Sequence, residues 1–170
     1  MIQTYKEHTP YISKSAYIAP SAVIIGEVSL ADNTSVWPQV TMRGDMAPIT
    51  VGEGSNIQDN SVVHVNTDLP TSIGRNVTIG HGAIIHGCTV GNTCLIGMGA
   101  IILDGAVIGD ESIVGAGSLV TPGKTFPPRS MIIGSPARVI RKLTDQEIEQ
   151  IRDNGERYVH YAAQYRDTAR

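Results

Sequence analysis

Residues 90–120 read VGNTCLIGMGAIILDGAVIGDESIVGAGSLV, and an aliphatic residue returns in this stretch at every sixth position. Four positions after each aliphatic residue the side chain is small. The aliphatic positions are Val90, Ile96, Ile102, Ile108, Val114 and Val120, and the small ones are Cys94, Ala100, Ala106, Ser112 and Ser118. A hexapeptide repeat of this kind predicts a parallel β-helix, in which each coil of the chain stacks on the preceding coil.

The same period extends towards the N-terminus, with three breaks. Earlier aliphatic positions at six-residue spacing are Ile12, Ile18, Ile24, Leu30, Val36 and Met42, then Val51, Ile57 and Val63, then Ile73, Ile79 and Ile85. Three extra residues follow Met42, four follow Val63, and one residue is missing after Ile85. The small inward position after Ile85 is expected to be Thr89. Insertions in a solenoid become loops on one side, often the binding side.

Length and composition indicate one domain with an appendage. The chain has 170 residues and a net charge of −3, with no block of like charges that would favour nucleic acid or an anionic membrane. No apolar stretch approaches the ~18 residues of a membrane span, and residues 1–10 lack the apolar region of a secretory signal. We expect a cytoplasmic protein with a β-helix domain over 1–140 and a helical segment over 141–170.

The C-terminal segment carries the signals of a helix. Thr144 is a good N-cap, Glu147 completes a capping box, and Leu143 can pair with Ile148 as a hydrophobic staple. We expect the helix to cover one flank of the β-helix and to be divided near Gly155. Its predicted apolar face consists of Ile148, Ile151, Tyr158 and Ala162.

The repeat places certain polar side chains in columns. Three hexads make one coil in this repeat class, so equivalent residues three hexads apart stack ~4.8 Å from each other. Arg43, His64 and His86 each follow the leading aliphatic residue and form one column. Asp59 and His81 form a second column, one hexad away around the coil.

These columns predict a metal site shared between chains. His64 and His86 are close enough to bind one metal ion, whereas His81 lies about one face away and must come from a neighbouring copy. If three chains pack around a threefold axis, Arg43 would also meet Asp59 of its neighbour. Three neutral imidazoles with a position open for water are typical of catalytic zinc, which lowers the pKa of bound water to about 7.

The chain resembles the γ-class carbonic anhydrase family over nearly its whole length. The resemblance is carried by Arg43-Gly44-Asp45, by residues 56–64 (NIQDNSVVH) and by residues 79–87 (IGHGAIIHG). It implies an all-β fold, a left-handed parallel β-helix of hexapeptide repeats with a C-terminal α-helix, assembled as a homotrimer with zinc at each subunit interface. The left hand follows from the resemblance, because right-handed crossovers are the general rule.

The resemblance also assigns roles to matching residues. It implies that His64, His81 and His86 are the metal ligands, that Gln58 positions the metal-bound water, and that Asn56 lies close to the substrate pocket. Zn²⁺ is the expected metal, and imidazole ligands also suit Fe²⁺ or Co²⁺.

Arg43 resembles the family's arginine near the bicarbonate site, held by Asp59 across the interface and by Asp45 in its own loop. A guanidinium suits a carboxylate-like product, and the same residue could instead serve only as an interface ion pair. Tyr158 either reaches the pocket, as in short-loop relatives, or simply packs the helix.

Two departures from the family concern proton export. The loop over residues 66–71 is short and offers only Asp68, and Met46 stands where the best-characterised members place a glutamate. Fast hydration needs proton export, so these departures bear on rate and not on metal binding.

Reversible hydration of CO2 to bicarbonate is the leading interpretation. A hexapeptide acyltransferase is the alternative from another reaction class, since the segment over residues 134–138 resembles the terminal motif of those enzymes. A metal-binding homologue with little hydration activity is the third, because architecture does not guarantee activity.

Overall fold

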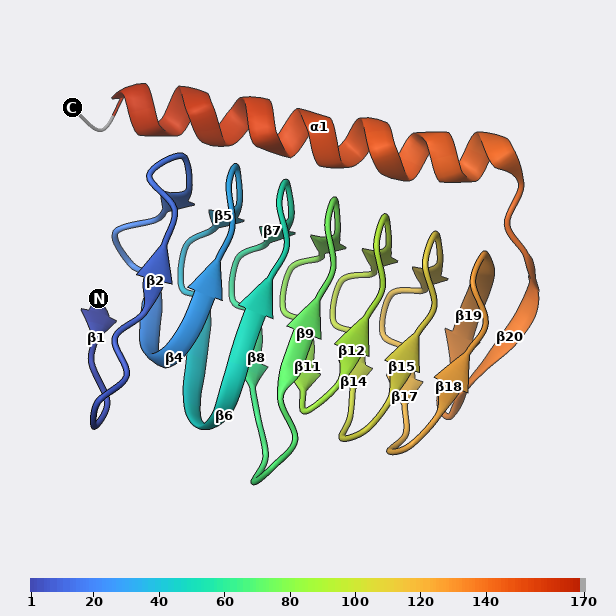
Figure 1. Ribbon diagram of the computed structural model, residues 1–170. Helices are drawn as coiled ribbons and strands as arrows, with labels where there is room; N and C mark the ends of the chain where they lie inside the picture. Colours follow the sequence, from blue (N-terminus) through green and yellow to red (C-terminus); the bar gives the residue numbers. More distant parts are fainter. Residues whose placement is uncertain (169–170) are drawn as a thin grey trace.

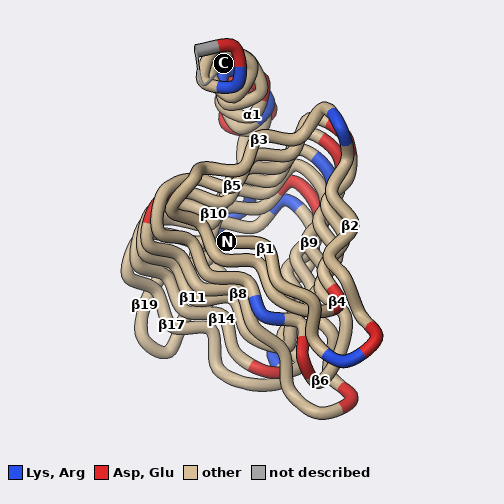
Figure 2. The backbone as a smooth tube through the Cα atoms, turned by 90° about the vertical axis from the view of Figure 1, so that its left-hand side faces the viewer, with Lys and Arg blue, Asp and Glu red and all other residues tan. Residues whose placement is uncertain are grey.

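Residues 1–168, which the computed structural model describes, form a left-handed parallel β-helix with one α-helix along its side (Figure 1). Viewed along its axis, the tube has three walls, and charged residues gather at the corners, on projecting loops and on the helix (Figure 2). The predicted fold class is confirmed. No helix among these residues has both the length and the apolar character needed to cross a membrane.

Short strands at the same position of successive coils pair in parallel and build each wall. The first wall contains β1 (Ile2–Gln3), β8 (Val62–His64), β11 (Ile84–His86), β14 (Ile101–Ile102) and β17 (Leu119–Val120). The second contains β2 (Tyr11–Ile12), β9 (Thr71–Ile73), β12 (Thr89–Val90), β15 (Val107–Ile108) and β18 (Thr125–Phe126). Two long strands, β4 (Val23–Leu30) and β6 (Thr41–Val51), pass through both walls. The third contains β3 (Tyr17–Ile18), β5 (Ser35–Val36), β7 (Asn56–Ile57), β10 (Thr78–Ile79), β13 (Leu95–Ile96), β16 (Ile113–Val114) and β19 (Ser130–Gly134). The last strand, β20 (Ala137–Lys142), pairs antiparallel with β19 at the end of this wall.

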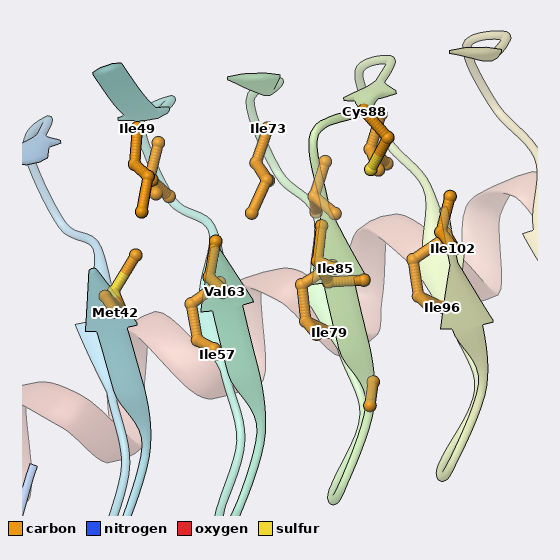
Figure 3. Packing of buried hydrophobic residues seen from close by; sticks show 14 of the residues in the cluster. Met42, Ile49, Ile57, Val63, Ile73, Ile79, Ile85, Cys88, Ile96 and Ile102 are labelled. Carbon is orange, nitrogen blue, oxygen red and sulfur yellow. The ribbon is translucent and has the colours of Figure 1, made fainter. Parts of the chain in front are cut away.

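The repeat residues form the core of the tube. Side chains alternate across a strand, so each leading aliphatic residue points inward while its neighbours point outward. Met42, Ile57, Ile79, Ile85 and Ile102 are fully buried and stack along the axis (Figure 3). The small residues fill the narrow corners; Ala100, Ala106 and Ser112 are also fully buried.

The prediction for Thr89 is wrong. Thr89 is exposed, and Cys88 is buried in its place. The residue missing from this hexad lies before Cys88, because Thr89 pairs with Ser72 and Val107 on the neighbouring strands and Val90 still pairs with Ile73. A shift of one residue exchanges the inward and outward faces of a strand, which explains why the error falls on a neighbouring pair.

The two insertions form loops on the side of the tube where the first and second walls meet. Pairing between β4 and β6 jumps from Gly26–Gly44 to Val28–Ile49, which accommodates the three extra residues. The second insertion closes on itself through two backbone hydrogen bonds between Asn66 and Leu69, of 3.2 and 3.0 Å. Both loops project beside the histidine column described below.

Helix α1 (Asp145–Thr168) returns along the third wall and packs on β3, β5, β7 and β10 (Figure 1). The capping box is confirmed, because Thr144 N donates to Glu147 Oε2 at 2.9 Å and Glu147 N donates to Thr144 Oγ1 at 3.2 Å. The predicted break at Gly155 is wrong, since the helix is continuous. Gly155 is buried beside Asn76, so the helix packs against the tube at this position, which offsets the low helix propensity of glycine.

Replacing Glu147 with Gln is expected to lower the melting temperature by about 2–4 °C at pH 7. Hydrogen bonds from Arg141, then from Thr144, lower the pKa of Glu147 from 4.5 to about 2. A carboxyl group whose pKa is lower in the folded than in the unfolded protein stabilises the fold when the pH lies above its unfolded-state pKa. This stabilisation is lost as the pH falls through the folded-state pKa. The difference in melting temperature between wild type and variant should therefore disappear between pH 4.5 and about 2, as followed by thermal unfolding.

Glu149→Gln is the matched control, because the Glu149 side chain is 64% exposed and has a longer contact, 3.4 Å, with Arg152. It should leave the melting temperature almost unchanged. If the difference in melting temperature between wild type and Glu147→Gln stays constant over the acid range, the carboxylate charge contributes nothing to stability.

Candidate metal centre

The first column lies where the first wall meets the second. Arg43 pairs with His64 in the β6–β8 ladder, and His64 pairs with His86 in the β8–β11 ladder. Their inward neighbours Met42 and Val63 are fully buried, so the three polar residues point to the outside of the tube. The stacking predicted for this column is confirmed.

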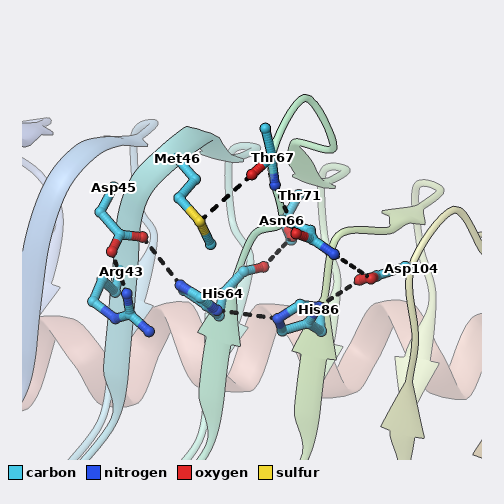
Figure 4. A network of polar contacts seen from close by, with 9 residues as sticks. All are labelled: Arg43, Asp45, Met46, His64, Asn66, Thr67, Thr71, His86 and Asp104. Atoms are coloured by element: carbon cyan, nitrogen blue, oxygen red, sulfur yellow. Dashed lines mark hydrogen bonds and ion pairs between the residues drawn. The ribbon is translucent and has the colours of Figure 1, made fainter.

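The imidazoles of His64 and His86 face each other. His64 Nδ1 lies 3.1 Å from His86 Nε2, and His64 Nε2 lies 3.1 Å from Asp45 Oδ1 (Figure 4). At the opposite end, His86 Nδ1 contacts Asp104 Oδ1. Asp45 also pairs with Arg43, as predicted. Each imidazole therefore has a carboxylate on one nitrogen and the other imidazole on the second.

Both carboxyl groups favour the ionised form. Burial raises the pKa of Asp45, but hydrogen bonds from His64 and Arg43 outweigh it and hold this pKa below its usual value. Hydrogen bonds from Asn66 and then from His86 lower the pKa of Asp104. An ionised carboxylate can only accept hydrogen bonds, so each histidine donates its outer N–H to a carboxylate.

When both imidazoles are neutral, this arrangement leaves a lone pair on both facing nitrogens. Two lone pairs 3.1 Å apart repel each other unless a cation lies near both. Two nitrogens bound to one zinc ion at ~2.05 Å with tetrahedral geometry are roughly 3.3 Å apart. Carboxylates that accept the outer N–H of metal-binding histidines are also a common feature of such sites. The pair therefore fits two ligands of one divalent metal ion.

The second column lies at the corner that follows β7 and β10 on the third wall. His81 Nδ1 lies 3.1 Å from Asp59 Oδ2, and Gly82 N donates to Asp59 O at 2.9 Å. The His81 side chain is 48% exposed, compared with 14% for His64. The second column is thus also confirmed, and its imidazole is open to solvent or to a partner.

A largely buried chain of hydrogen bonds runs from Gln58, the residue before Asp59, to helix α1. Gln58 Nε2 donates to Asn56 Oδ1 at 3.1 Å, and Asn56 Nδ2 donates to Thr78 Oγ1 at 2.9 Å. Asn154 Nδ2 of the helix donates to the same hydroxyl at 3.0 Å. Because Asn56 is fully buried, its contacts within this chain orient Gln58.

Tyr158 joins this chain from the helix. Its hydroxyl shares a hydrogen bond with Gln58, and its pKa is raised by burial and by the nearby charge of Asp59. The ring also packs edge-on against Trp37, with ring centroids 5.6 Å apart. Both suggested roles of Tyr158 are therefore compatible with its position. A groove of about 400 Å³ beside it is lined by Gln58, His81 and Tyr158, among other residues.

The two columns lie on different edges of the same tube. Across residues 1–168, no three His, Cys, Asp or Glu side chains of one chain gather into a group that could hold a metal ion. The contacts of His64 and His86 run to Asp45 and Asp104, and the ion-pair contact of His81 runs to Asp59.

Sequence reasoning missed Asp104 and Asn66. Asp104 lies one position beyond Leu103, the residue that follows His86 in the first column, and it reaches His86 diagonally. Asn66 comes from the second insertion, and its Nδ2 donates to Asp104 Oδ2 at 2.8 Å. A search for diagonal neighbours of the histidines would have found Asp104, whereas nothing in the repeat predicts how the inserted loop folds.

The chain is similar in sequence and in fold to known proteins. The family model of the bacterial transferase hexapeptide (six repeats) matches residues 87–122. A probable carbonic anhydrase of Methanocaldococcus jannaschii is 53% identical over 148 residues, covering 87% of this chain and 93% of that protein. Gamma carbonic anhydrase 2, a mitochondrial protein of Arabidopsis thaliana, is 44% identical over 162 residues; the match covers 92% of this chain and 58% of that protein.

A crystal structure of a Bacillus cereus protein, described as a putative acetyltransferase, superimposes with a TM-score of 0.97. It is 40% identical, and the match covers 98% of this chain and 97% of that one. The repeat and the three-walled tube thus define a hexapeptide-repeat protein of the left-handed β-helix class. Within that class, the chain belongs to the γ-class carbonic anhydrase family.

Proposed function

We propose that this protein is a homotrimeric cytoplasmic enzyme that catalyses the reversible hydration of CO2 to bicarbonate. His64 and His86 of one subunit and His81 of the next would hold a divalent metal ion, Zn²⁺ or alternatively Fe²⁺ or Co²⁺. The observation that carries the proposal is the pair of facing imidazole nitrogens, 3.1 Å apart, each backed by a carboxylate on the opposite side of its ring. Relatives named carbonic anhydrase support the reaction.

An apolar surface beside the first column supports the trimer. Val62 and Ile84 precede the two histidines by two residues on the outer side of the first wall, and they are 39% and 38% exposed. Aliphatic side chains at this exposure favour burial against another surface. The Arg43 side chain pairs with Asp45 and is still 45% exposed, so it could also contact Asp59 of a neighbour. One contact between subunits would then complete the metal ligands and this ion pair together.

The chain's own residues would divide the remaining work. A divalent ion held by three imidazoles supplies a Lewis acid that acidifies water at neutral pH. Asn56 fixes the orientation of the Gln58 amide, and Tyr158 contacts that amide from the helix, so Gln58 can orient water or substrate oxygen without rearranging. Arg43, held by Asp45, would present a planar fork to the carboxylate-like face of bicarbonate.

Acyl transfer remains the second candidate, because the similar Bacillus cereus structure is described as a putative acetyltransferase. In this chain, residues 134–137 form the turn between β19 and β20 at the last coil. The histidine pair lies on β8 and β11, several coils away. A metal-binding homologue with little hydration activity is the third candidate, in keeping with Met46 and with the short loop at Asp68.

Protein purified without oxygen is expected to contain one metal ion per subunit and to hydrate CO2 in a stopped-flow assay. Chelation should abolish hydration, and added Zn²⁺ should restore it. His64→Ala should neither contain metal nor hydrate CO2. His160→Ala is the matched control, since this exposed helix histidine contacts Gln164 and lies outside both columns. Acetyl transfer that survives chelation would favour the acyltransferase. Full metal content without hydration would favour the metal-binding homologue with little hydration activity.

A further inference from the structure

The second insertion is fastened to the metal-binding edge by one side chain. Asn66 Nδ2 donates to Asp104 Oδ2 at 2.8 Å, while Asn66 Oδ1 accepts from Thr67 N at 2.8 Å. The backbone of Asn66 is held by its two hydrogen bonds with Leu69. Every polar group of Asn66 thus has a partner, and its amide presents a donor to Asp104 in a fixed orientation (Figure 4).

Asp104 uses its two carboxylate oxygens for two different tasks. Oδ2 accepts from Asn66, and Oδ1 accepts from His86 Nδ1. Space for this side chain exists because residue 87 is glycine. A Cβ at Gly87 would lie 2.6 Å from Asp104 Oδ1, and Gly87 has a φ of +54°, a conformation that side chains rarely adopt. The turn after His86 is therefore shaped to admit the carboxylate.

We propose that Asp104, aligned by Asn66, is a positioning residue for His86. By accepting the Nδ1–H, it holds His86 in the tautomer and ring orientation that direct the Nε2 lone pair towards His64. The short loop over residues 66–71 would then act as a clamp on Asp104, a role that needs no acidic side chain in the loop. The inference rests on the proposed function for the identity of the bound ligand, a divalent metal.

Asp104→Asn tests the role of the carboxylate with little change in size. Asn66 and His86 bond to different oxygens of Asp104, and asparagine keeps an oxygen at only one of these two positions, so its amide nitrogen would face another donor. We expect the Kd for Zn²⁺, measured by competition with a chromophoric chelator, to rise by about 10–100-fold. Asp110→Asn is the matched control, because Asp110 likewise accepts from an asparagine, Asn92 N at 2.7 Å, without touching a histidine.

A spectroscopic measurement separates positioning from general stability. In wild-type protein stripped of metal, long-range ¹H–¹⁵N spectra should show His86 as the Nδ1–H tautomer and His64 as the Nε2–H tautomer. Asp104→Asn should alter the His86 pattern and leave the His64 pattern in place. Thermal unfolding should be alike for Asp104→Asn and Asp110→Asn.

The role of Asn66 is tested with a double-mutant cycle. If Asn66 acts through Asp104, Asn66→Ala should weaken Zn²⁺ binding less than Asp104→Asn, and the double variant should bind like Asp104→Asn alone. A Zn²⁺ Kd within twofold of wild type in Asp104→Asn, or an unchanged His86 pattern, would overturn the inference. If wild-type protein itself bound no zinc, the proposed function would fail, and the His86 spectrum would still decide the role of Asp104.

Discussion

His81→Ala is expected to reduce the metal content from one ion per subunit to nearly none, although His64 and His86 remain in place. The reason is geometric: the two facing imidazoles lie on one edge of the tube and His81 lies on another, so the proposed site would need ligands from two chains. Two imidazoles alone leave the metal bound mainly by water and hold it weakly. Elemental analysis of the purified protein is the direct measurement.

A mixing experiment makes this prediction sharper. His81→Ala subunits keep an intact histidine pair, and His64→Ala subunits keep an intact His81. When the two variants are unfolded together and refolded, each mixed trimer should regain one complete site, because one of its three interfaces joins the two intact halves. Each variant refolded alone should stay metal-free. Full occupancy in His81→Ala, or no recovery in mixed trimers that have formed, would refute a site shared between subunits.

Gly97→Ala is expected to destabilise the fold by about 3 kcal/mol or more, lowering the melting temperature by roughly 6–12 °C. Gly97 follows β13 on the third wall, where the next coil passes very close. A Cβ at this position would lie 2.4 Å from Ala116 N and 2.8 Å from Gly115 C. These atoms belong to backbone that is itself hydrogen-bonded between coils, since Gly97 N donates to Val114 O at 2.7 Å. The two coils must therefore move apart to relieve the steric overlap of the added methyl group.

Gly117→Ala provides the control for this prediction. Gly117 lies in a turn with a φ of +65°, and a Cβ there would meet nothing within 4 Å. Its replacement should cost only the conformational penalty of a left-handed residue, about 1–2 kcal/mol. Thermal unfolding of the two variants decides the matter. Equal melting temperatures would mean that the spacing of the coils adapts to an added methyl group.

The repeat predicts the tube well because steric confinement acts on every inward residue. Ile79, Ile85 and Ile102 have no alternative to the core once the coils stack, so counting hexads places them correctly. Counting failed at Thr89, where a missing residue leaves the period ambiguous between neighbours. It also failed at Gly155, where packing against Asn76 outweighs the local propensity. Strand β20 pairs antiparallel with β19 and lies beyond the last hexad, so no period could predict it.

In the candidate site, too, contacts between equivalent positions of the repeat could be predicted, and contacts that depend on loops or on the helix could not. Vertical neighbours such as His64 and His86 follow from the period alone, since parallel strands place equal positions side by side. The contacts of Asp104 are diagonal and depend on a loop whose conformation is set by its own hydrogen bonds. The roles of Gln58 and Tyr158 depend on where the helix docks, which involves residues a hundred positions apart.

The return of helix α1 along the third wall affects how the tube loses its structure. In a simple solenoid each coil contacts only its neighbours, so the two ends can fray independently. Here the helix starts at the last coil and ends beside the first coils (Figure 1). At that end, Arg166 Nη1 donates to Ser15 O at 2.6 Å, and the ring centroids of Tyr165 and Tyr17 are 5.8 Å apart. Melting of the terminal coil would therefore also weaken the contacts of the helix with the first coils, and we expect the two ends to unfold together.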